Sequence, residues 1–370
     1  MSAQRQQRIA FYMPSLAGGG AQRVFLHLAR GFAERGYEVH LVLARAQGPY
    51  LPQVPSCVRM IDLRASRVLT SLPGLVRYLR DQRPCALLSA LDHANAVAIC
   101  ARWLARAPTR VIVTIHSTPS QVVANARTLR AKLLPVWTRF FYRWADTVVA
   151  VSQGVADELV HYVGIPEERV KVVYNPIVTP ELFRKAEEPL DHPWFREGEP
   201  PVILGVGRLT KPKDFPTLIR AFALVRRQRP ARLMILGEGE ERPELERLVR
   251  ELGIKEDVCL PGFVQNPYAY MKRAAVFVLS SRWEGLPTVL VEALALDVPI
   301  VSTNCPSGTV EILDNGRLGM LTEVGNPDSL AQAIESTLSS PGTSRTAQDY
   351  ERFTLEYALD RYERLAGLVR

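Results

Sequence analysis

Short apolar runs alternate with amphipathic stretches along the chain. The run RIAFYM at 8–13 predicts a buried strand, and Ala21 to Arg35 predicts a helix because its apolar residues recur every three or four positions. Further strands are predicted at 38–44, 86–89, 110–115, 147–151 and 171–175, with helices at 72–81, 94–106, 128–144 and 154–163. This alternation is typical of an α/β fold, in which helices cover a parallel sheet.

A proline-rich stretch divides this pattern. Between Pro176 and Pro201 the periodicity disappears and six prolines accumulate among charged residues, which predicts a linker. A second alternation follows, with strands at 202–208, 232–237, 258–262, 276–280 and 299–303 and helices at 214–229, 243–252, 268–273 and 288–296. We expect domains at 1–185 and 186–345, and a C-terminal helix within 346–370 that packs back toward the first domain.

Composition narrows the class of protein. A chain of 370 residues with 47% hydrophobic residues can form two cores. Its apolar runs are far shorter than the roughly 20 residues that cross a bilayer, and the N-terminus has no signal-peptide core. The five cysteines are scattered and contain no C-x-x-C pair, which disfavours a disulfide framework or a zinc site. We therefore expect a cytoplasmic protein without a membrane span.

Charge is distributed unevenly between the two predicted domains. Residues 1–185 contain 24 Lys and Arg against 11 Asp and Glu, whereas the remainder contains 22 against 27. The basic first half indicates an anionic partner, either nucleic acid, phosphate or a membrane surface, unless its arginines are simply solvated. A nucleic-acid-binding protein remains an alternative, although no base-reading motif is present, and we expect no nucleic-acid partner.

Candidate ligand-binding residues of the first half follow predicted strands, where open α/β sheets bind ligands. If two such domains face each other, their ligand lies in the cleft between them. Gly18 to Gly20 precede a helix whose free N–H groups suit an anion. Their spacing is not G-x-G-x-x-G, and Ala44-Arg45 replace the acidic residue of a nicotinamide-cofactor site. His116 follows the strand at 110–115 and either contacts a substrate hydroxyl or is a structural residue.

The second half also contains candidate residues that follow predicted strands, and these are cations and carboxylates. Arg208 follows its first strand and Lys213 lies five residues later, a combination that suits a diphosphate, although a basic surface loop is the alternative. No P-loop is present. Glu284 falls in the loop after the strand at 276–280, and Glu292 falls in the next helix among apolar neighbours. Both carboxylates can accept hydrogen bonds from sugar hydroxyls, and a buried Glu292 needs a partner.

Taken together, these motifs resemble those of the retaining glycosyltransferases of family four. The resemblance covers nearly the whole chain, and 284–313 is especially similar to bacterial members that build cell-surface or lipid-linked glycans. It implies the GT-B fold, in which two Rossmann-like domains with parallel sheets face a central cleft. One departure is Gln22, where the family often has Glu. The motifs that carry the resemblance are Gly18-Gly19-Gly20, Gly207-Arg208-Leu209, Lys213-Asp214-Phe215, Gly237-Glu238-Gly239 and the pair Glu284 and Glu292.

The resemblance also implies roles for individual residues. Arg208 and Lys213 would hold the donor diphosphate, and Glu292 would bind the ribose. Glu284 would hold the donor sugar, Val264 would contact the base and His116 would touch the transferred sugar. The implied catalytic residues are His116, Arg208, Lys213 and Glu284. The implied donor-binding residues are Gly19, Gly20, Arg208, Lys213, Val264, Glu284, Gly285, Leu286, Pro287, Thr288 and Glu292.

The implied reaction moves a hexose or N-acetylhexosamine, with retention, from a nucleotide-diphosphate sugar to a hydroxyl of a glycan acceptor. UDP is the favoured nucleotide, and a polyprenyl-diphosphate-linked acceptor of surface polysaccharide or glycan biosynthesis is expected. No cofactor and no metal are expected, because the chain has no Asp-x-Asp motif and Arg208 and Lys213 can stabilise the leaving diphosphate. A nucleotide-sugar epimerase or a phosphorylase of the same fold remains an alternative.

A basic and aromatic segment at 127–144 bears on localisation. Arg127, Arg130 and Lys132 are interspersed with leucines and precede several aromatic residues. We interpret the segment as a surface that rests on the anionic inner face of the cytoplasmic membrane, near the acceptor. The alternative is that its aromatic residues pack against the first sheet. The first interpretation predicts a cytoplasmic, peripheral membrane protein.

Overall fold

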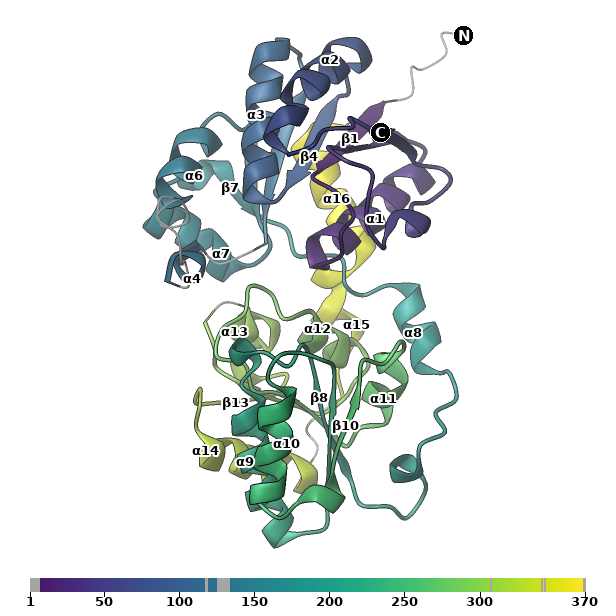
Figure 1. Cartoon of the computed structure of the whole chain (residues 1–370), viewed down its shortest axis with the longest axis vertical. Coiled ribbons are helices and arrows are strands. Elements are labelled where there is room, and N and C mark those ends of the chain that lie inside the picture. Colours follow the sequence, from purple (N-terminus) through teal and green to yellow (C-terminus); the bar gives the residue numbers. More distant parts are fainter. Residues whose placement is uncertain are drawn as a thin grey trace. The chain divides into compact units, whose positions relative to one another are not determined.

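The computed structural model describes residues 7–116, 119–124, 134–306, 308–340, 342 and 344–368. The chain forms two compact units, each built around its own sheet (Figure 1). Unit 1 comprises Met1–Pro176 and Phe353–Arg370, and unit 2 comprises Ile177–Arg352. Among the described helices, none combines the length and the apolar sequence that crossing a bilayer requires.

Unit 1 contains a seven-stranded parallel sheet in the order β3-β2-β1-β4-β5-β6-β7. The central strands are mostly apolar and almost completely buried because both faces of the sheet are covered. Edge strand β3 was not predicted, because most of its side chains are exposed and give no apolar pattern. The strands are β1 (Arg8–Met13), β2 (Glu38–Leu43), β3 (Arg59–Asp62), β4 (Ala86–Ala90), β5 (Arg110–Ile115), β6 (Thr147–Ala150) and β7 (Val170–Val172).

Helices connect these strands. The predicted helix at 154–163 is divided into an α-helix and a π-helix at Leu159–Val163. The predicted helix at 128–144 is described only from Leu134 onward. The α-helices described for unit 1 are α1 (Gly20–Glu34), α2 (Leu72–Gln82), α3 (Asp92–Ala105), α4 (Pro119–Ala124), α6 (Leu134–Tyr142), α7 (Gln153–Glu158) and α16 (Leu355–Ala366).

The C-terminal helix α16 packs against α1 and completes the core of unit 1 (Figure 1). Leu359 and Tyr362 are buried in the same cluster as Phe25 of α1. The two helices approach closely at Gly31, where an added Cβ would lie 2.6 Å from Leu359 Cδ1. Arg35 then pairs with carboxylates of α16, including Glu363 at 3.1 Å. The last helix of the chain is therefore an integral part of the first unit.

Unit 2 contains a six-stranded parallel sheet in the order β10-β9-β8-β11-β12-β13. With unit 1, it confirms the prediction of two Rossmann-like α/β units. Its strands are β8 (Val202–Val206), β9 (Arg232–Leu236), β10 (Val258–Gly262), β11 (Val276–Leu279), β12 (Ile300–Thr303) and β13 (Met320–Thr322). Its α-helices are α8 (Pro180–Ala186), α9 (Phe215–Gln228), α10 (Arg242–Glu251), α11 (Pro267–Arg273), α12 (Thr288–Ala295), α13 (Thr309–Ile312), α14 (Pro327–Ser339) and α15 (Ala347–Tyr350).

The unit boundaries differ from the predicted domain boundaries. The predicted linker contains α8, which is joined to the α11 region because Arg273 donates to the Ala186 carbonyl at 3.0 Å and Asn266 donates to the Lys185 carbonyl at 2.8 Å. The first boundary therefore falls after residue 176 rather than after 185. The predicted single element at 346–370 is also divided, since α15 belongs to unit 2 and α16 to unit 1.

Candidate active site

Two glycine-containing loops lie side by side at the carboxyl edge of the unit 2 sheet, after β8 and β9. Gly207 donates to the Leu236 carbonyl at 3.0 Å, and Leu209 donates to the Glu238 carbonyl at 2.9 Å. At Gly237, φ is +143°, and an added Cβ would lie 1.9 Å from the Gly207 carbonyl oxygen. The glycine is therefore required both for its backbone conformation and for the close approach of the two loops.

The β8–α9 loop is joined to the β11–α12 loop by an ion pair. Lys213 Nζ lies 2.5 Å from Glu284 Oε1, and the two side chains are only 20% and 13% exposed. Ser281 donates to the same carboxylate oxygen at 2.6 Å, and Ser280 donates to the Lys213 carbonyl at 2.8 Å. Two of the predicted site residues, 71 positions apart in the sequence, are therefore in direct contact.

A second ion pair reinforces this junction. Asp214 is buried with φ +47°, and its Oδ2 accepts hydrogen bonds from Thr217 at 2.9 Å and from Arg282 at 3.0 Å. The backbone N–H of Arg282 also donates to the Pro212 carbonyl at 2.8 Å. Sequence analysis did not identify Asp214 or Arg282 as positioning residues. Each flanks a predicted site residue, but only the folded loops show that they meet.

Arg208 differs from Lys213 in its surroundings. Its side chain is exposed, and among the described residues its guanidinium has no hydrogen-bond or ion-pair partner. Since a guanidinium binds phosphate oxygens as a planar fork, an unpaired one at the carboxyl end of β8 suits an anionic ligand. Of these two cations, Lys213 is held by a carboxylate, whereas Arg208 has no such partner among the described residues.

Glu292 lies inside α12 and is 8% exposed. The hydroxyl of Tyr268, from α11, donates to Glu292 Oε1 at 3.4 Å. The expectation that this carboxylate needs a partner is therefore confirmed. Sequence analysis did not find Tyr268, because its position in the short helix α11 carries no signal that it faces α12.

The loop between Glu284 and α12 contains the remaining predicted donor-binding residues. Leu286 and Pro287 are buried, whereas Gly285 and Thr288 are partly exposed. The loop packs against the segment after β12, where Gly308 has φ +89° and an added Cβ would lie 3.1 Å from the Gly285 carbonyl oxygen. Val264 is partly exposed and follows β10. Because all strands of unit 2 are parallel, these loops lie at one edge of its sheet.

In unit 1, the predicted glycines lie at the N-terminus of α1. Gly19 has φ +136°, and an added Cβ would lie 2.8 Å from the side-chain oxygen of Gln22. Gly20 is the first residue of the helix. Gln22, at the position where the family often has Glu, is buried. Its neutral amide therefore packs close to the glycine turn.

His116 follows β5, where its ring is fixed by a hydrogen bond. Thr114 Oγ1 lies 3.0 Å from His116 Nε2 and donates its proton to the Ser89 carbonyl, also at 3.0 Å. A hydroxyl has a single proton, so Nε2 must be the donor to Thr114, and Nδ1 is the nitrogen with a free lone pair. Burial lowers the pKa of His116 to about 4. The imidazole is therefore neutral at pH 7 and can accept a hydrogen bond through Nδ1.

Arg127, Arg130 and Lys132 lie outside the described residues, so the predicted membrane segment is described only in part. In α6, Tyr142 is buried in the unit. Trp137 and Phe140 of the same helix and Trp144 just beyond it are about half exposed. The guanidinium of Arg143 lies 4.7 Å from the centre of the Phe140 ring. The described part of the segment thus combines one packed face with an exposed aromatic and basic face.

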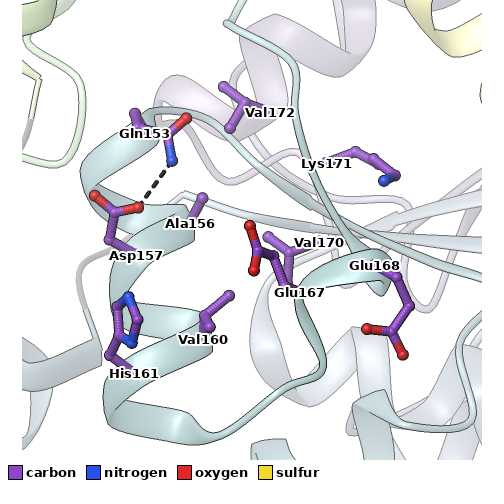
Figure 2. Close-up of a pocket in the computed structure, with 10 residues that line it drawn as sticks. All are labelled: Gln153, Ala156, Asp157, Val160, His161, Glu167, Glu168, Val170, Lys171 and Val172. Carbon is purple, nitrogen blue, oxygen red and sulfur yellow. Dashed lines mark hydrogen bonds between the residues drawn. The ribbon is translucent and has the colours of Figure 1, made fainter.

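A polar pocket of about 560 Å³ lies elsewhere in unit 1, between α7, the π-helix and β7 (Figure 2). Gln153 points toward Asp157 and donates to it at 2.8 Å. Glu167 and Glu168 also line the pocket, and Lys171 is the only lysine or arginine among the described residues that line it. Because carboxylates repel phosphate, the pocket does not suit an anionic donor. None of the predicted donor-binding residues lines it.

Two units, each with its own parallel sheet covered by helices, have the fold of the GT-B class. Residues 18–180 match the family model for Glycosyltransferase Family 4, and residues 187–353 match that for Glycosyl transferases group 1. The chain belongs to glycosyltransferase family 4, as the sequence motifs predicted. The prediction that it is an enzyme of the transferase class is likewise confirmed.

Similar proteins span nearly the whole chain. The N-acetylgalactosamine-N,N'-diacetylbacillosaminyl-diphospho-undecaprenol 4-alpha-N-acetylgalactosaminyltransferase of Campylobacter jejuni is 32% identical over 345 residues, which cover 90% of each chain. The lipopolysaccharide core biosynthesis glycosyltransferase LpsE of Rhizobium meliloti is 28% identical and covers 87% of this chain and 86% of its own. The structure of Anabaena Alr3699/HepE in complex with UDP has the same fold, with a TM-score of 0.77 at 22% identity over 98% of this chain and 100% of its own.

Proposed function

We propose that the chain transfers a hexose or N-acetylhexosamine from a UDP-sugar to a hydroxyl of a glycan acceptor linked to polyprenyl diphosphate, with retention of anomeric configuration. The observation that carries this proposal is the junction between the β8–α9 and β11–α12 loops. There, Lys213 and Glu284 are in contact, and Arg208 extends from the same loop without a partner among the described residues. A cation pair next to a carboxylate suits a ligand that combines phosphates with hydroxyl groups.

In the proposed reaction, the diphosphate departs from the sugar while Arg208 and Lys213 stabilise its growing negative charge. Because these two cations can replace a divalent ion at the diphosphate, we propose catalysis without a metal or another cofactor. Glu284 accepts hydrogen bonds from the donor sugar, and the loop at 285–288 contacts the sugar and phosphate. Glu292, supported by Tyr268, binds the ribose hydroxyls, and Val264 contacts the base. His116 contacts the transferred sugar, and Gly19 and Gly20 line the donor side.

The proposed acceptor is supported by the name of a relative. The Campylobacter jejuni relative is named as an enzyme acting on a diphospho-undecaprenol-linked saccharide, and its similarity extends over 90% of this chain. An acceptor of this kind is held in a membrane. The chain therefore has to reach the membrane surface, which is consistent with the basic charge of residues 1–185.

A donor screen tests the central proposal. A panel of UDP-, GDP- and ADP-sugars is added to the whole chain, with thermal shift and donor hydrolysis as measurements. We expect UDP-sugars to stabilise the protein most, since a ligand that binds only the folded state raises its melting temperature. NMR of the anomeric coupling in the product tests retention. The proposal is wrong if none of the nucleotide sugars stabilises the protein and none is hydrolysed or transferred.

We further propose that the exposed face of α6 and Trp144 rests on an anionic cytoplasmic membrane surface, together with Arg127, Arg130 and Lys132. Exposed tryptophan and phenylalanine beside arginine is the pattern of interfacial helices. Co-sedimentation with vesicles containing phosphatidylglycerol is expected to decrease in a variant with Trp137, Phe140 and Trp144 changed to Ser.

The matched control for this experiment is Phe263→Ser, which removes a 78% exposed aromatic side chain from unit 2. Charge is tested separately by changing Arg127, Arg130 and Lys132 to Glu. Equal pelleting of the wild type and both variants would exclude this membrane surface.

A further inference from the structure

A buried polar network lies beneath the carboxyl edge of the unit 1 sheet, next to β4 and β5. The fully buried Asn95 donates through Nδ2 to the Thr114 carbonyl at 3.1 Å and to the Tyr142 hydroxyl at 3.0 Å. Both amide protons are thereby used, and the Tyr142 hydroxyl donates its own proton to Asp92 Oδ1 at 3.0 Å. Among the described residues, Asp92 Oδ2 has no hydrogen-bond partner. The network thus orients the carboxylate and leaves one oxygen available.

Hydrogen bonds link both Asp92 and His116 to Thr114, His116 directly and Asp92 through Tyr142 and Asn95. Ala90 of β4 pairs with Thr114 of β5, so the residues two positions beyond each follow adjacent ends of parallel strands. Such strands lie about 4.8 Å apart. His116 Nε2 donates to Thr114, which leaves Nδ1 as an acceptor. Two hydrogen-bond acceptors, a carboxylate oxygen and an imidazole nitrogen, therefore follow adjacent strands at the edge where α/β sheets bind ligands.

Two further observations indicate that this edge is more than a packing feature. Leu91, immediately before Asp92, has φ +76°, a conformation that is costly for a leucine and that clusters at functional sites. Asn95 Oδ1 and Ser89 Oγ are buried without a hydrogen-bond partner among the described residues, which is uncommon for buried polar atoms. Burial also raises the pKa of Asp92, although the Tyr142 hydroxyl opposes that shift.

We propose that Asp92 Oδ2 and His116 Nδ1 bind hydroxyl groups of a saccharide substrate, and that Tyr142 and Thr114 are positioning residues for this pair. Hydroxyl groups are the matching chemistry because both atoms are acceptors and the carboxylate would repel a phosphate. The inference rests on the proposed glycosyl transfer, to which it adds a saccharide-binding residue. Because His116 is proposed to contact the transferred sugar, that sugar is the expected ligand, and steady-state kinetics distinguishes it from the acceptor glycan.

The first experiment compares Asp92→Ala and Tyr142→Phe with the wild type in the whole chain, with donor and acceptor varied separately. Loss of a hydrogen bond to a charged group predicts a roughly 10- to 100-fold rise in KM for one substrate and a smaller change in kcat. The substrate whose KM rises identifies the saccharide. Asp81→Ala, which removes an exposed carboxylate at the end of α2, is the matched control. If both KM values for Asp92→Ala equal those of Asp81→Ala, the proposal is overturned.

The second experiment needs no substrate. Nitrogen-15 NMR of labelled histidine is expected to show the Nε2–H tautomer for His116 in the wild type. Thr114→Val is expected to weaken this preference, and Thr114→Ser is expected to restore it because the hydroxyl returns. An Nδ1–H tautomer in the wild type would overturn the paired-acceptor site. If the wild type transfers no sugar from any donor but shows the expected tautomer, the proposed function fails while the positioning by Thr114 stands.

Discussion

Replacement of Lys213 by alanine tests the grip on the donor diphosphate directly. We expect kcat/KM for the nucleotide sugar to fall by about 10- to 150-fold, which corresponds to about 1.5 to 3 kcal/mol of lost transition-state stabilisation. The variant keeps Arg208 and Lys211, so the loop retains cations that can face the diphosphate. Activity should therefore be reduced rather than abolished.

The size of this effect follows from the ion pair in the structure. Two unit charges 4 Å apart interact by about 4 kcal/mol at an effective dielectric constant of 20. Lys213 Nζ is already 2.5 Å from Glu284 Oε1, however, so a phosphate must share the ammonium group with this carboxylate. The net gain is then closer to that of one hydrogen bond to a charged group, about 1.5 to 3 kcal/mol.

The same substitution is expected to have a moderate effect on stability. Removing one partner of a fully buried ion pair costs about 3 to 5 kcal/mol, whereas an exposed pair contributes about 0 to 1 kcal/mol. Lys213 and Glu284 are 20% and 13% exposed, and Ser281 continues to donate to the carboxylate. We therefore expect a loss of about 1 to 2 kcal/mol, which leaves the variant folded at room temperature.

The assay is steady-state transfer with the donor varied at saturating acceptor, and urea denaturation measures stability in parallel. Lys211→Ala is the matched control. Lys211 is exposed and lies in the same short 3₁₀-helix, and its replacement removes the same positive charge. Wild-type kcat/KM in Lys213→Ala would refute the argument. So would an equal loss in Lys211→Ala, because the effect would then be one of overall charge.

Three further predictions concern other parts of the two units. Burial lowers the pKa of His116 to about 4 in the folded state, whereas an unfolded histidine has an ordinary pKa of about 6.5. As the pH falls below about 6.5, the unfolded chain therefore binds a proton that the folded chain does not, and the unfolded state is favoured. The folded state should therefore lose up to about 3 kcal/mol between pH 6.5 and 4, and His116→Asn should lose less in urea denaturation. Gly237→Ala should destabilise unit 2 by at least about 3 kcal/mol, because the Cβ of the alanine would lie 1.9 Å from the Gly207 carbonyl oxygen. The measurement is the urea midpoint, which should fall, and wild-type stability would contradict this prediction. Tyr268→Phe should raise the donor KM about threefold, since the long 3.4 Å hydrogen bond to Glu292 contributes little. Glu292→Ala should raise the donor KM much more. Similar KM values in both variants would contradict the assignment of Glu292 to the ribose hydroxyls.

The apolar pattern was sufficient to predict the central strands of both sheets. Strands such as β1 and β8 are buried on both faces, so their continuous apolar runs stand out from the flanking helices. Edge strand β3 was missed because its exposed side chains have no such pattern. Helix α8 was missed because prolines on either side made its segment look like a linker, whereas its contacts with the α11 region come from residues about 80 positions away.

The candidate site likewise has residues that the sequence predicts and contacts that it does not. The position of a residue after a strand identified Arg208, Lys213, Glu284 and His116, because parallel strands bring their carboxyl ends to one edge. The partners of these residues were not predictable. Spacing along the chain does not show which side chains of different loops meet, and the contact between Lys213 and Glu284 depends on the neighbouring strands β8 and β11.

The pairing of α1 with α16 has a consequence for synthesis of the protein. Unit 2 is a continuous stretch of chain, so it is translated completely before the last helix is made. Unit 1 begins first, but the face of α1 that contains Gly31 stays uncovered until Leu359 and Tyr362 emerge. The unit whose translation begins first is thus the last to complete its core, and until α16 is made this apolar face of α1 is the kind of exposed surface that promotes aggregation.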